Sequence, residues 1–266
     1  MKQGLRLVAV LTALSALAVV GVHTRPIVSA QDEELRVPER GFVSSEPADS
    51  WEQGLLSGNG SIGASVFGRP LDETVVFSHK RMFVPERPPL LPPPTGERLF
   101  EIRRLIDRGL YEQAARLASD AGEQKEFLYP DPLMPAFDLR VRMGADRFVG
   151  GYQRSTNFET GETAVRWTDA RGAFERRLFV SRADGVAIMR ITGPAPGTVA
   201  CRLELAPREP GHARFKANVN KLAIAADPPY LTYRNGFVNA YPGSIHGLEG
   251  VARVVSRNGG ISREGR

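Results

Sequence analysis

The segment FERRLFVSRADGVAIMRIT, residues 174–192, decides the fold class. One β-prone run extends from Phe174 to Ser181, and a second extends from Val186 to Thr192. Between the two runs, Ala183-Asp184-Gly185 supplies turn chemistry. Before them along the chain, residues 137–143 alternate between apolar and polar side chains, which is typical of a strand that buries one face. We therefore predict two antiparallel strands joined by a tight turn.

The same pattern continues outward from this segment in both directions. Turns rich in glycine, proline and aspartate separate further β-prone runs. These runs cover residues 62–67, 71–77, 137–143, 162–168, 198–206 and 251–256. Evenly spaced strands with turns between them predict a mainly β protein, an antiparallel β-sandwich or barrel.

Two features near the C-terminal end concern strand pairing. Asn235-Gly236 lies between residues 230–234 and 237–240, and Asn-Gly suits the positive φ angles of a type I′ turn, so we predict a hairpin there. The strand 251–256 is followed by a turn at 257–260 and a return that begins at Ile261. We expect the sandwich to be incomplete at this end, which leaves an open sheet edge for self-association.

A short helical insert is predicted after the proline-rich residues 85–94. This proline-rich stretch is interpreted as a stiff crossover, with binding of a PxxP-recognising partner as the alternative. Thr95 can cap a helix, and apolar residues then recur at steps of three and four. Gly109 is expected to separate two short helices, whose apolar stripe packs most simply against a sheet of the same chain.

Residues 1–30 have the composition of a secretory signal peptide. Two basic residues precede an uncharged run from Leu7 to Val22, and Val28-Ser29-Ala30 offers a permissive cleavage site. The uncharged run is shorter than the roughly 20 apolar residues that span a membrane, which disfavours an uncleaved anchor. We expect cleavage after Ala30, a secreted or periplasmic product with no membrane attachment, and a flexible leader over residues 31–50.

The charge balance argues against a nucleic-acid partner. The chain of 266 residues contains 35 basic and 30 acidic residues. Lys2, Arg6 and Arg25 belong to the signal peptide, so 32 basic residues accompany 30 acidic ones after cleavage. Such a balance is an ordinary solvated surface and not a footprint for phosphates.

The sequence predicts no metal, no cofactor and no catalytic residue. Cys201 is the only cysteine, which excludes an intrachain disulfide and a cysteine-based metal cluster. The histidines are scattered, and no serine lies in a G-x-S-x-G motif. The acids Asp72-Glu73 and Glu159 with Glu162 are interpreted as solvated side chains and not as a catalytic pair.

Four segments, taken in order along the chain, resemble a known family. LLSGNGSIGASVFG (Leu55–Gly68) resembles the Gly-Asn-Gly motif near the start of glycoside hydrolase family 95 proteins, the α-L-fucosidase group. SHKRMFVP (Ser78–Pro85) lies where members carry an asparagine-led segment. LIDRGLYEQAARL (Leu105–Leu117) is similar to the helical insert, and residues 174–192 are similar to the paired strands that follow.

The resemblance implies a two-layer β super-sandwich over residues 51–266, preceding an (α/α)₆ barrel in enzymes that hydrolyse terminal sugars with inversion. The family's catalytic groups lie on the barrel, and no position of this sequence matches them. We therefore expect a chain cut short before the barrel, whose partner is a glycan or oligosaccharide.

Four residues are candidates for contact with that glycan. Trp51 precedes the sandwich and can stack on a pyranose ring, whereas Trp167, within a strand, is expected in the core. Asn59, His79 and Arg81 are expected on neighbouring loops that face the sugar pocket. The alternative for Asn59 is a structural role in a tight glycine turn.

Two functions remain open at this point. The first is the N-terminal, non-catalytic domain of an exported glycoside hydrolase. The second is a free-standing exported module that binds carbohydrate or another partner.

Overall fold

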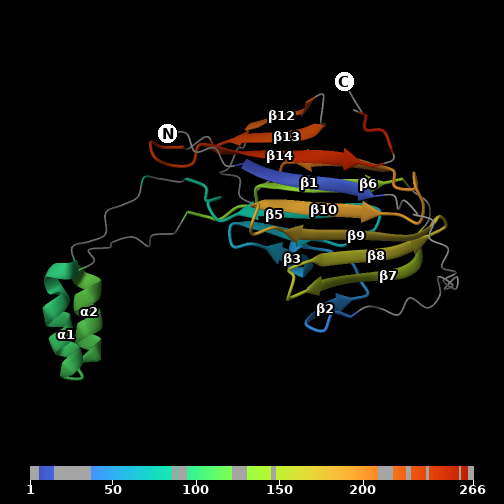
Figure 1. The fold of residues 1–266 in the computed structure, drawn as a ribbon. Coiled ribbons are helices and arrows are strands. Elements are labelled where there is room, and N and C mark those ends of the chain that lie inside the picture. The colour runs from blue at the N-terminus through green and yellow to red at the C-terminus, as the bar shows by residue number, and fades with distance from the viewer. Residues whose placement is uncertain are drawn as a thin grey trace.

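The structure of the chain is a computed structural model. It describes residues 6–14, 37–85, 88, 95–121, 131–144, 148–208, 218–225, 229–237, 240–257 and 259–262. Strands within these residues form two sheets, one of nine strands and one of five (Figure 1). The mainly β fold predicted from the sequence is confirmed, and the two sheets form a β-sandwich.

The nine-stranded sheet combines the two ends of the chain with its middle. Its strand order is β12 (Asn218–Ala225), β13 (Tyr230–Gly236), β14 (Gly247–Ser256), β1 (Arg6–Leu14), β10 (Val186–Thr192), β9 (Gly172–Val180), β8 (Thr163–Asp169), β7 (Phe148–Asn157) and β2 (Gly41–Ser44). β9 and β10 are the pair predicted from residues 174–192, and they are joined antiparallel as expected.

The five-stranded sheet is antiparallel throughout. Its order is β11 (Cys201–Ala206), β6 (Phe137–Met143), β5 (Asp72–His79), β4 (Ile62–Val66) and β3 (Leu55–Gly58). β3 is an edge strand here, as β2 is in the larger sheet. The strands predicted at 62–67, 71–77 and 137–143 are therefore confirmed with small shifts of their ends.

The core lies between the sheets and is built by alternation. Along β8, every second residue is buried, and Trp167 stacks on Phe174 of β9 with ring centroids 5.4 Å apart. Phe137 of β6 packs at 5.4 Å against Phe77 of β5 and at the same distance against Tyr233 of β13. The prediction that Trp167 belongs to the core is confirmed.

A buried ion pair joins the two sheets. Glu73 of β5 accepts a hydrogen bond of 2.6 Å from Nη1 of Arg176 on β9, and neither side chain reaches solvent. The amides of Gly68 and Thr74 also donate to the Glu73 carboxylate. Burial raises the pKa of Glu73, and Arg176 opposes that shift. The guanidinium lies 5.1 Å from the Trp167 ring centroid, so the ion pair is packed into the aromatic core.

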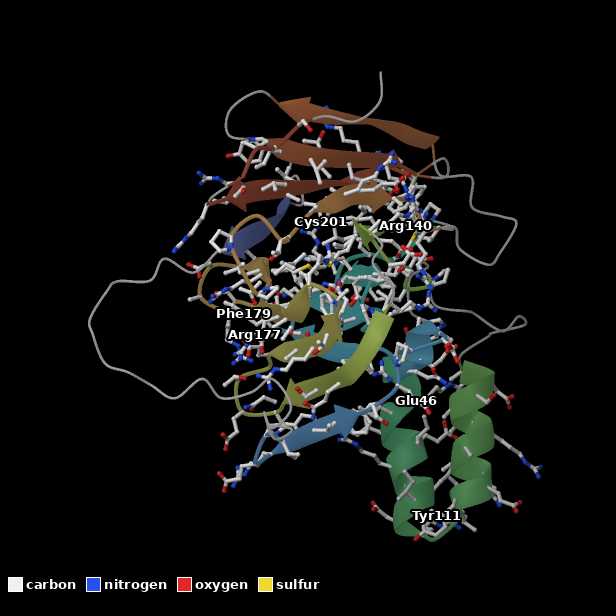
Figure 2. The ribbon with its side chains drawn as sticks, turned by 90° about the vertical axis from the view of Figure 1, so that its right-hand side faces the viewer. Glu46, Tyr111, Arg140, Arg177, Phe179 and Cys201 are labelled. Carbon is white, nitrogen blue, oxygen red and sulfur yellow. The ribbon has the colours of Figure 1, made fainter. Side chains whose placement is uncertain are left out.

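The helical insert consists of η2 (Thr95–Arg98), α1 (Leu99–Asp107) and α2 (Tyr111–Ala121). Gly109 separates the two helices with φ near 74°, as the sequence predicts. The expectation that their apolar stripe packs on a sheet is wrong. The helices pack on each other and stand apart from the sandwich (Figure 1). Tyr111, at the turn between them, lies at the end of the hairpin farthest from the sheets (Figure 2).

Two strands occur where the sequence predicts a signal peptide and a flexible leader. β1 lies within residues 1–30, and β2 lies within residues 31–50. A short apolar run suits both a signal peptide and a buried strand, so its composition does not separate the two. β2 has four residues, too few for a clear alternation.

The hairpin predicted at Asn235-Gly236 is wrong. Both residues belong to β13, where Asn235 pairs with Leu248 and Gly236 with Gly247 of β14. The connection between these strands comes later, after Phe237, whose amide donates to the carbonyl of His246. Pairing with β14 therefore overrides the local turn preference of Asn-Gly.

Candidate functional site

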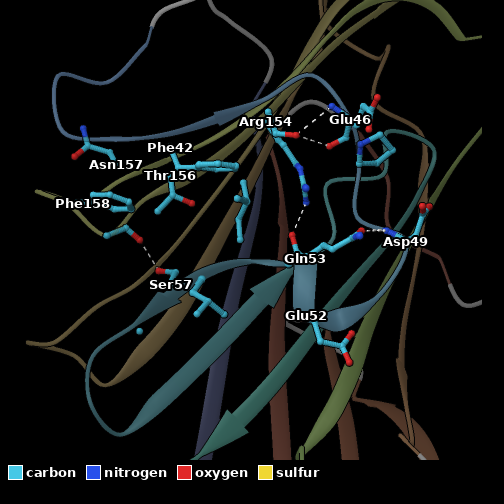
Figure 3. Close-up of a pocket in the computed structure, with 17 residues that line it drawn as sticks. Phe42, Glu46, Asp49, Glu52, Gln53, Ser57, Arg154, Thr156, Asn157 and Phe158 are labelled. Carbon is cyan, nitrogen blue, oxygen red and sulfur yellow. Dashed lines mark hydrogen bonds between the residues drawn. The ribbon is translucent and has the colours of Figure 1, made fainter.

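A groove of about 820 Å³ opens where the edge strands of the two sheets face each other (Figure 3). Its walls come from β2, from the segment 46–54 that includes η1 (Trp51–Gln53), from β3, and from the end of β7 with the turn that follows. Segments far apart in the sequence thus meet at one open side of the sandwich.

Two buried side chains fix the floor of the groove. Nη1 of Arg154 on β7 donates to the carbonyls of Gln53 (2.9 Å) and Phe67 (3.1 Å). The hydroxyl of Ser57 on β3 donates to the carbonyl of Gly161 at 2.6 Å and accepts from the amide of Val180. These bonds connect both sheets, so the groove is held in place by the core.

Three large apolar side chains line the groove and remain exposed. The exposed fractions are 51% for Phe42, 70% for Leu56 and 68% for Phe158. The turn after β7 holds Phe158 outward, because the Asn157 carboxamide oxygen accepts from the amides of Glu159 and Thr160. Exposed apolar side chains gathered at one place indicate a binding surface. Flat aromatic faces are suited to the C–H face of a sugar ring.

Thr156 adds a buried polar group to the same groove. The residue is 7% exposed, it pairs with Phe42 across the β2–β7 ladder, and its Oγ1 has no hydrogen-bond partner within the part of the chain that the structure describes. Buried hydroxyls in proteins are normally hydrogen-bonded. A bound hydroxyl-bearing ligand would supply the missing partner.

Acidic side chains line the groove as well, at Glu46, Asp49 and Glu52. A hydrogen bond with the Ser50 side chain lowers the pKa of Glu52. A general acid for glycoside hydrolysis needs the opposite shift. Glu52 is therefore suited to accept hydrogen bonds from sugar hydroxyls and not to protonate a leaving group.

The carboxyl groups whose pKa is raised serve the framework. Burial raises the pKa of Glu73 and of Asp138. Glu73 is held by Arg176, and Asp138 accepts from Nη1 of Arg208 at 3.2 Å. Neither residue lines the groove.

The other acids considered in the sequence analysis are also paired with arginines. Asp72 lies 3.5 Å from Arg142, Glu159 lies 3.8 Å from Arg40, and Glu162 lies 3.0 Å from Arg177. The interpretation of Glu73 as a solvated side chain is wrong, because Glu73 is fully buried against Arg176. That these acids are not a catalytic pair stays a prediction.

Three of the four predicted sugar-contacting residues lie together at one end of the smaller sheet. His79 pairs with Ile62, close to the turn that carries Asn59, and the amide of Arg81 donates to Nδ1 of His79. The Asn59 oxygen accepts from the amides of Ser61 and Ile62, and its Nδ2 donates to the carbonyl of Ser181. Asn59 thus shapes the turn, as the structural alternative expects. Burial, followed by the charges of Lys80 and Arg81, lowers the pKa of His79.

Trp51 is separated from this group by the length of β3. It lies in η1 before the first residue of β3, whereas Asn59 follows the last, and its side chain is exposed. None of the four predicted residues lines the groove. Their contact with sugar stays a prediction.

Sequence reasoning missed Phe42, Thr156 and Phe158. Phe42 fell within the predicted leader. Thr156 and Phe158 lie on either side of Asn157. Asparagine is common in turns, so a large apolar residue directly after it could have indicated an exposed Phe158. Their convergence depends on the pairing of β2 with β7, which no local pattern shows.

Residues 42–265 match the family described as glycosyl hydrolase family 65, N-terminal domain. The chain belongs to this family. The match begins within β2 and runs past the end of β14, so both walls of the groove belong to the family 65 N-terminal domain.

A named relative is similar to this chain in amino-acid sequence. The protein named alpha-L-fucosidase 2 from Arabidopsis thaliana is 24% identical over 179 residues. The aligned part is 67% of this chain and 21% of the relative, so the chain spans about a fifth of that protein.

Two further properties concern the described residues alone. No helix among them is long and apolar enough to cross a membrane. No three histidine, cysteine or acidic side chains among them are grouped as metal ligands.

Proposed function

We propose that the chain is the N-terminal, non-catalytic β-sandwich domain of an exported α-L-fucosidase-like glycoside hydrolase of the family 95 type. The observation that carries the proposal is the family match over residues 42–265, together with the similarity to a fucosidase of which it spans a fifth. The hydrolytic groups would then belong to the rest of such an enzyme.

The groove supports a direct role in holding the glycan. Phe42 and Phe158 offer apolar faces, and Glu52 offers an ionised acceptor. Thr156 offers a hydroxyl that has no partner among the described residues. Sugar sites combine such faces with a few polar groups that fix orientation. The domain would hold a terminal sugar or its neighbours while another part of the enzyme acts.

Glycan binding and catalysis are tested on the same preparation. We expect the purified chain to bind fucosylated oligosaccharides, measured by chemical-shift changes, and to leave aryl α-L-fucosides unhydrolysed. The double change Phe42→Ala and Phe158→Ala should weaken binding by roughly tenfold or more, since stacking contacts of this kind contribute about 1 kcal/mol each.

A matched control tests whether a loss of glycan binding comes from the groove or from removing any exposed aromatic side chain. Phe100 on α1 is 75% exposed and lies outside the groove, so Phe100→Ala should leave binding unchanged. Equal loss in the control and the groove variant, or no binding by the unchanged chain, would contradict a glycan role for the groove. Hydrolysis that disappears on Glu52→Gln would overturn the non-catalytic role.

Export rests on the composition of residues 1–30. We expect the secreted or periplasmic product to begin at Gln31. N-terminal sequencing that finds Met1 retained would contradict cleavage.

A free-standing carbohydrate-binding module is the second candidate. The groove favours it, since both walls come from this chain. The genomic DNA beyond the codon for Arg266 discriminates the two: a helical barrel, in frame or frame-shifted, supports the enzyme domain, and an unrelated gene with its own promoter supports the module.

A further inference from the structure

Two arginines are buried among the residues that the structure describes, and only one of them has an anionic partner. Arg176 is 1% exposed and forms the ion pair with Glu73 described above. Arg154 is 5% exposed, and no carboxylate of the described residues lies within ion-pair distance of it. Charged side chains are almost never fully buried in proteins unless they are paired. Arg154 therefore carries a buried positive charge for which the described part of the chain offers no counter-charge.

The guanidinium of Arg154 is held at one end and free at the other. Nη1 donates to the carbonyls of Gln53 and Phe67, and Figure 3 shows the first of these bonds. Nε is buried without a hydrogen-bond partner, and Nη2 has no such partner among the described residues either. The Nε–H bond and one N–H bond of Nη2 point the same way, and this edge of a guanidinium matches the two oxygens of a carboxylate. The free edge thus has the geometry of a carboxylate-binding fork.

A second unpartnered polar group lies beside Arg154 in the groove. Thr156 follows two residues later on β7, and both residues line the groove. Side chains two residues apart point to the same face of a strand. Thr156 Oγ1 is buried and lacks a hydrogen-bond partner within the described residues, as Arg154 Nε does. Because buried polar groups are normally satisfied, the pair indicates a ligand that brings both an anion and a hydroxyl group.

The acidic residues of the groove do not cancel this buried charge. Glu46, Asp49 and Glu52 line the groove with exposed side chains. Charges in contact with solvent are screened by water and salt, whereas a buried charge is screened much less. Arg69 brings another guanidinium to the same segment, where its Nη2 donates to the carbonyl of Asp49. An anion at the floor of the groove would therefore be governed by Arg154.

The aromatic faces of the groove adjoin this floor. Phe42 pairs with Thr156 across the β2–β7 ladder, and Phe158 follows Thr156 after one intervening residue. Both phenylalanines are exposed. A pyranose ring has an apolar C–H face and hydroxyl groups at its edge, so it suits the aromatic faces and Thr156 together. A carboxylate on the ring would supply the anion that Arg154 lacks.

We propose that the groove selects glycans that contain a uronic acid, whose carboxylate pairs with Nε and Nη2 of Arg154 while a ring hydroxyl bonds to Thr156. The inference rests on the proposed glycan role of the groove and names the class of sugar that the groove prefers. A neutral sugar offers hydroxyl groups to the same atoms but leaves the buried charge of Arg154 without compensation.

The test compares two oligosaccharides that differ at one carboxyl group. The first is a fucosylated oligosaccharide with a terminal glucuronate residue, and the second is its carboxyl-reduced form, in which glucose stands in place of glucuronate. Isothermal titration of the full chain at pH 7 measures the Kd of each. We expect the acidic form to bind at least about tenfold more tightly, because hydrogen bonds between charged partners are stronger than those between neutral ones.

Three variants assign the preference to the floor of the groove. Arg154→Lys keeps the charge and removes the fork, so it should lose most of the preference for the acidic form. Thr156→Val should weaken the binding of both forms by a similar factor, since both carry the hydroxyl groups. Arg182→Lys changes an exposed arginine outside the groove and should leave both Kd values unchanged. Circular dichroism of each variant reports whether it is folded.

The outcomes separate this inference from the proposed function. Equal binding of the two forms by the unchanged chain, or tighter binding of the reduced form, would overturn the uronic-acid preference and leave the glycan role standing. A preference that persists in folded Arg154→Lys would overturn the role of the fork. Failure of the chain to bind either form would contradict the glycan role and the inference together. The comparison on the unchanged chain decides the class of sugar even where Arg154→Lys does not fold.

Discussion

Arg176 lies between the two sheets with both terminal nitrogens engaged. Nη1 donates to Glu73 and to the carbonyl of Arg69, and Nη2 donates to the carbonyl of Pro70. The residue thereby secures the turn before β5 as well as the ion pair. Removing one member of a buried pair leaves the other charge without compensation.

We predict that Arg176→Met lowers the free energy of unfolding by about 3–5 kcal/mol. Arg177→Met, which removes a partly exposed arginine from the same strand, should cost about 1 kcal/mol or less. Urea unfolding of both variants measures the difference. Adding Glu73→Met to Arg176→Met should recover most of the loss, and equal effects of the two arginines would contradict the role of the buried pair.

Asp169 links stability to pH at the turn between β8 and β9. Hydrogen bonds from the Arg171 side chain, together with that residue's amide at 2.8 Å, lower the pKa of Asp169. A carboxyl with a lowered folded-state pKa stabilises the fold above its unfolded pKa of about 3.9 and loses that contribution as pH falls through the folded value.

Asp169→Asn should therefore cost about 1–2 kcal/mol at pH 7, where the charged bonds are intact. The difference from the unchanged chain should narrow as the pH falls below about 4. Unfolding free energies measured from pH 7 to pH 2 test this. A difference that stays constant over the range would show that Asp169 is not the titrating group.

At the scale of elements, β14 packs closely on β6 because Gly250 of β14 has no side chain where it meets Phe137 of β6. A Cβ at Gly250 would lie 2.5 Å from Cε1 of Phe137, whose ring is fixed by Phe77 and Tyr233. Such a contact forces the ring or the strand to move.

We predict that Gly250→Ala lowers the free energy of unfolding by about 1–3 kcal/mol. Gly144→Ala is the matched control, since no described residue beyond its chain neighbours has an atom within 4 Å of the added Cβ. Thermal melts compare the two. Phe137→Leu combined with Gly250→Ala should cost less than the sum of the single changes, and strict additivity would argue against the contact.

The strands that could be predicted are those with local alternation. β6 and β8 bury their apolar residues at every second position, so their sequences carry the period directly. β9 also buries every second side chain, but Arg176 takes one of these positions, so its sequence does not alternate. β1 and β2 could not be predicted in this way, because their pairing with β10, β14 and β7 joins segments distant in the chain.

In the candidate site, too, features with a local sequence pattern could be predicted, and features that depend on the pairing of distant segments could not. Asn59 was found because glycines surround it, and its turn is where the sequence placed it. The groove was missed because Phe42 and Phe158 become neighbours only when β2 pairs with β7 and the chain turns after Asn157. Neither feature follows from a local sequence pattern.

For the whole molecule, the nine-stranded sheet depends on the position between β10 and β14. Production of residues 31–266 alone removes β1 and leaves that position open. We predict that this shorter chain forms oligomers or aggregates, because unpaired strand edges associate. Size-exclusion chromatography beside the full chain measures the outcome. A monomer at every concentration, with a sharp cooperative melt, would show that the sandwich closes without β1.

The placement of β1 also sets an order of events in time. Both sides of this strand are bonded to neighbours, so drawing it out along its axis must break two ladders together, whereas an edge strand can be peeled away. Under the proposed export, a chain that folds first would keep the apolar part of residues 1–30 inside the sheet, away from an export channel and a peptidase. The proposed export and folding would then compete, and Gly250→Ala, which disturbs the packing of β14 on Phe137, should increase the cleaved fraction of newly made chains.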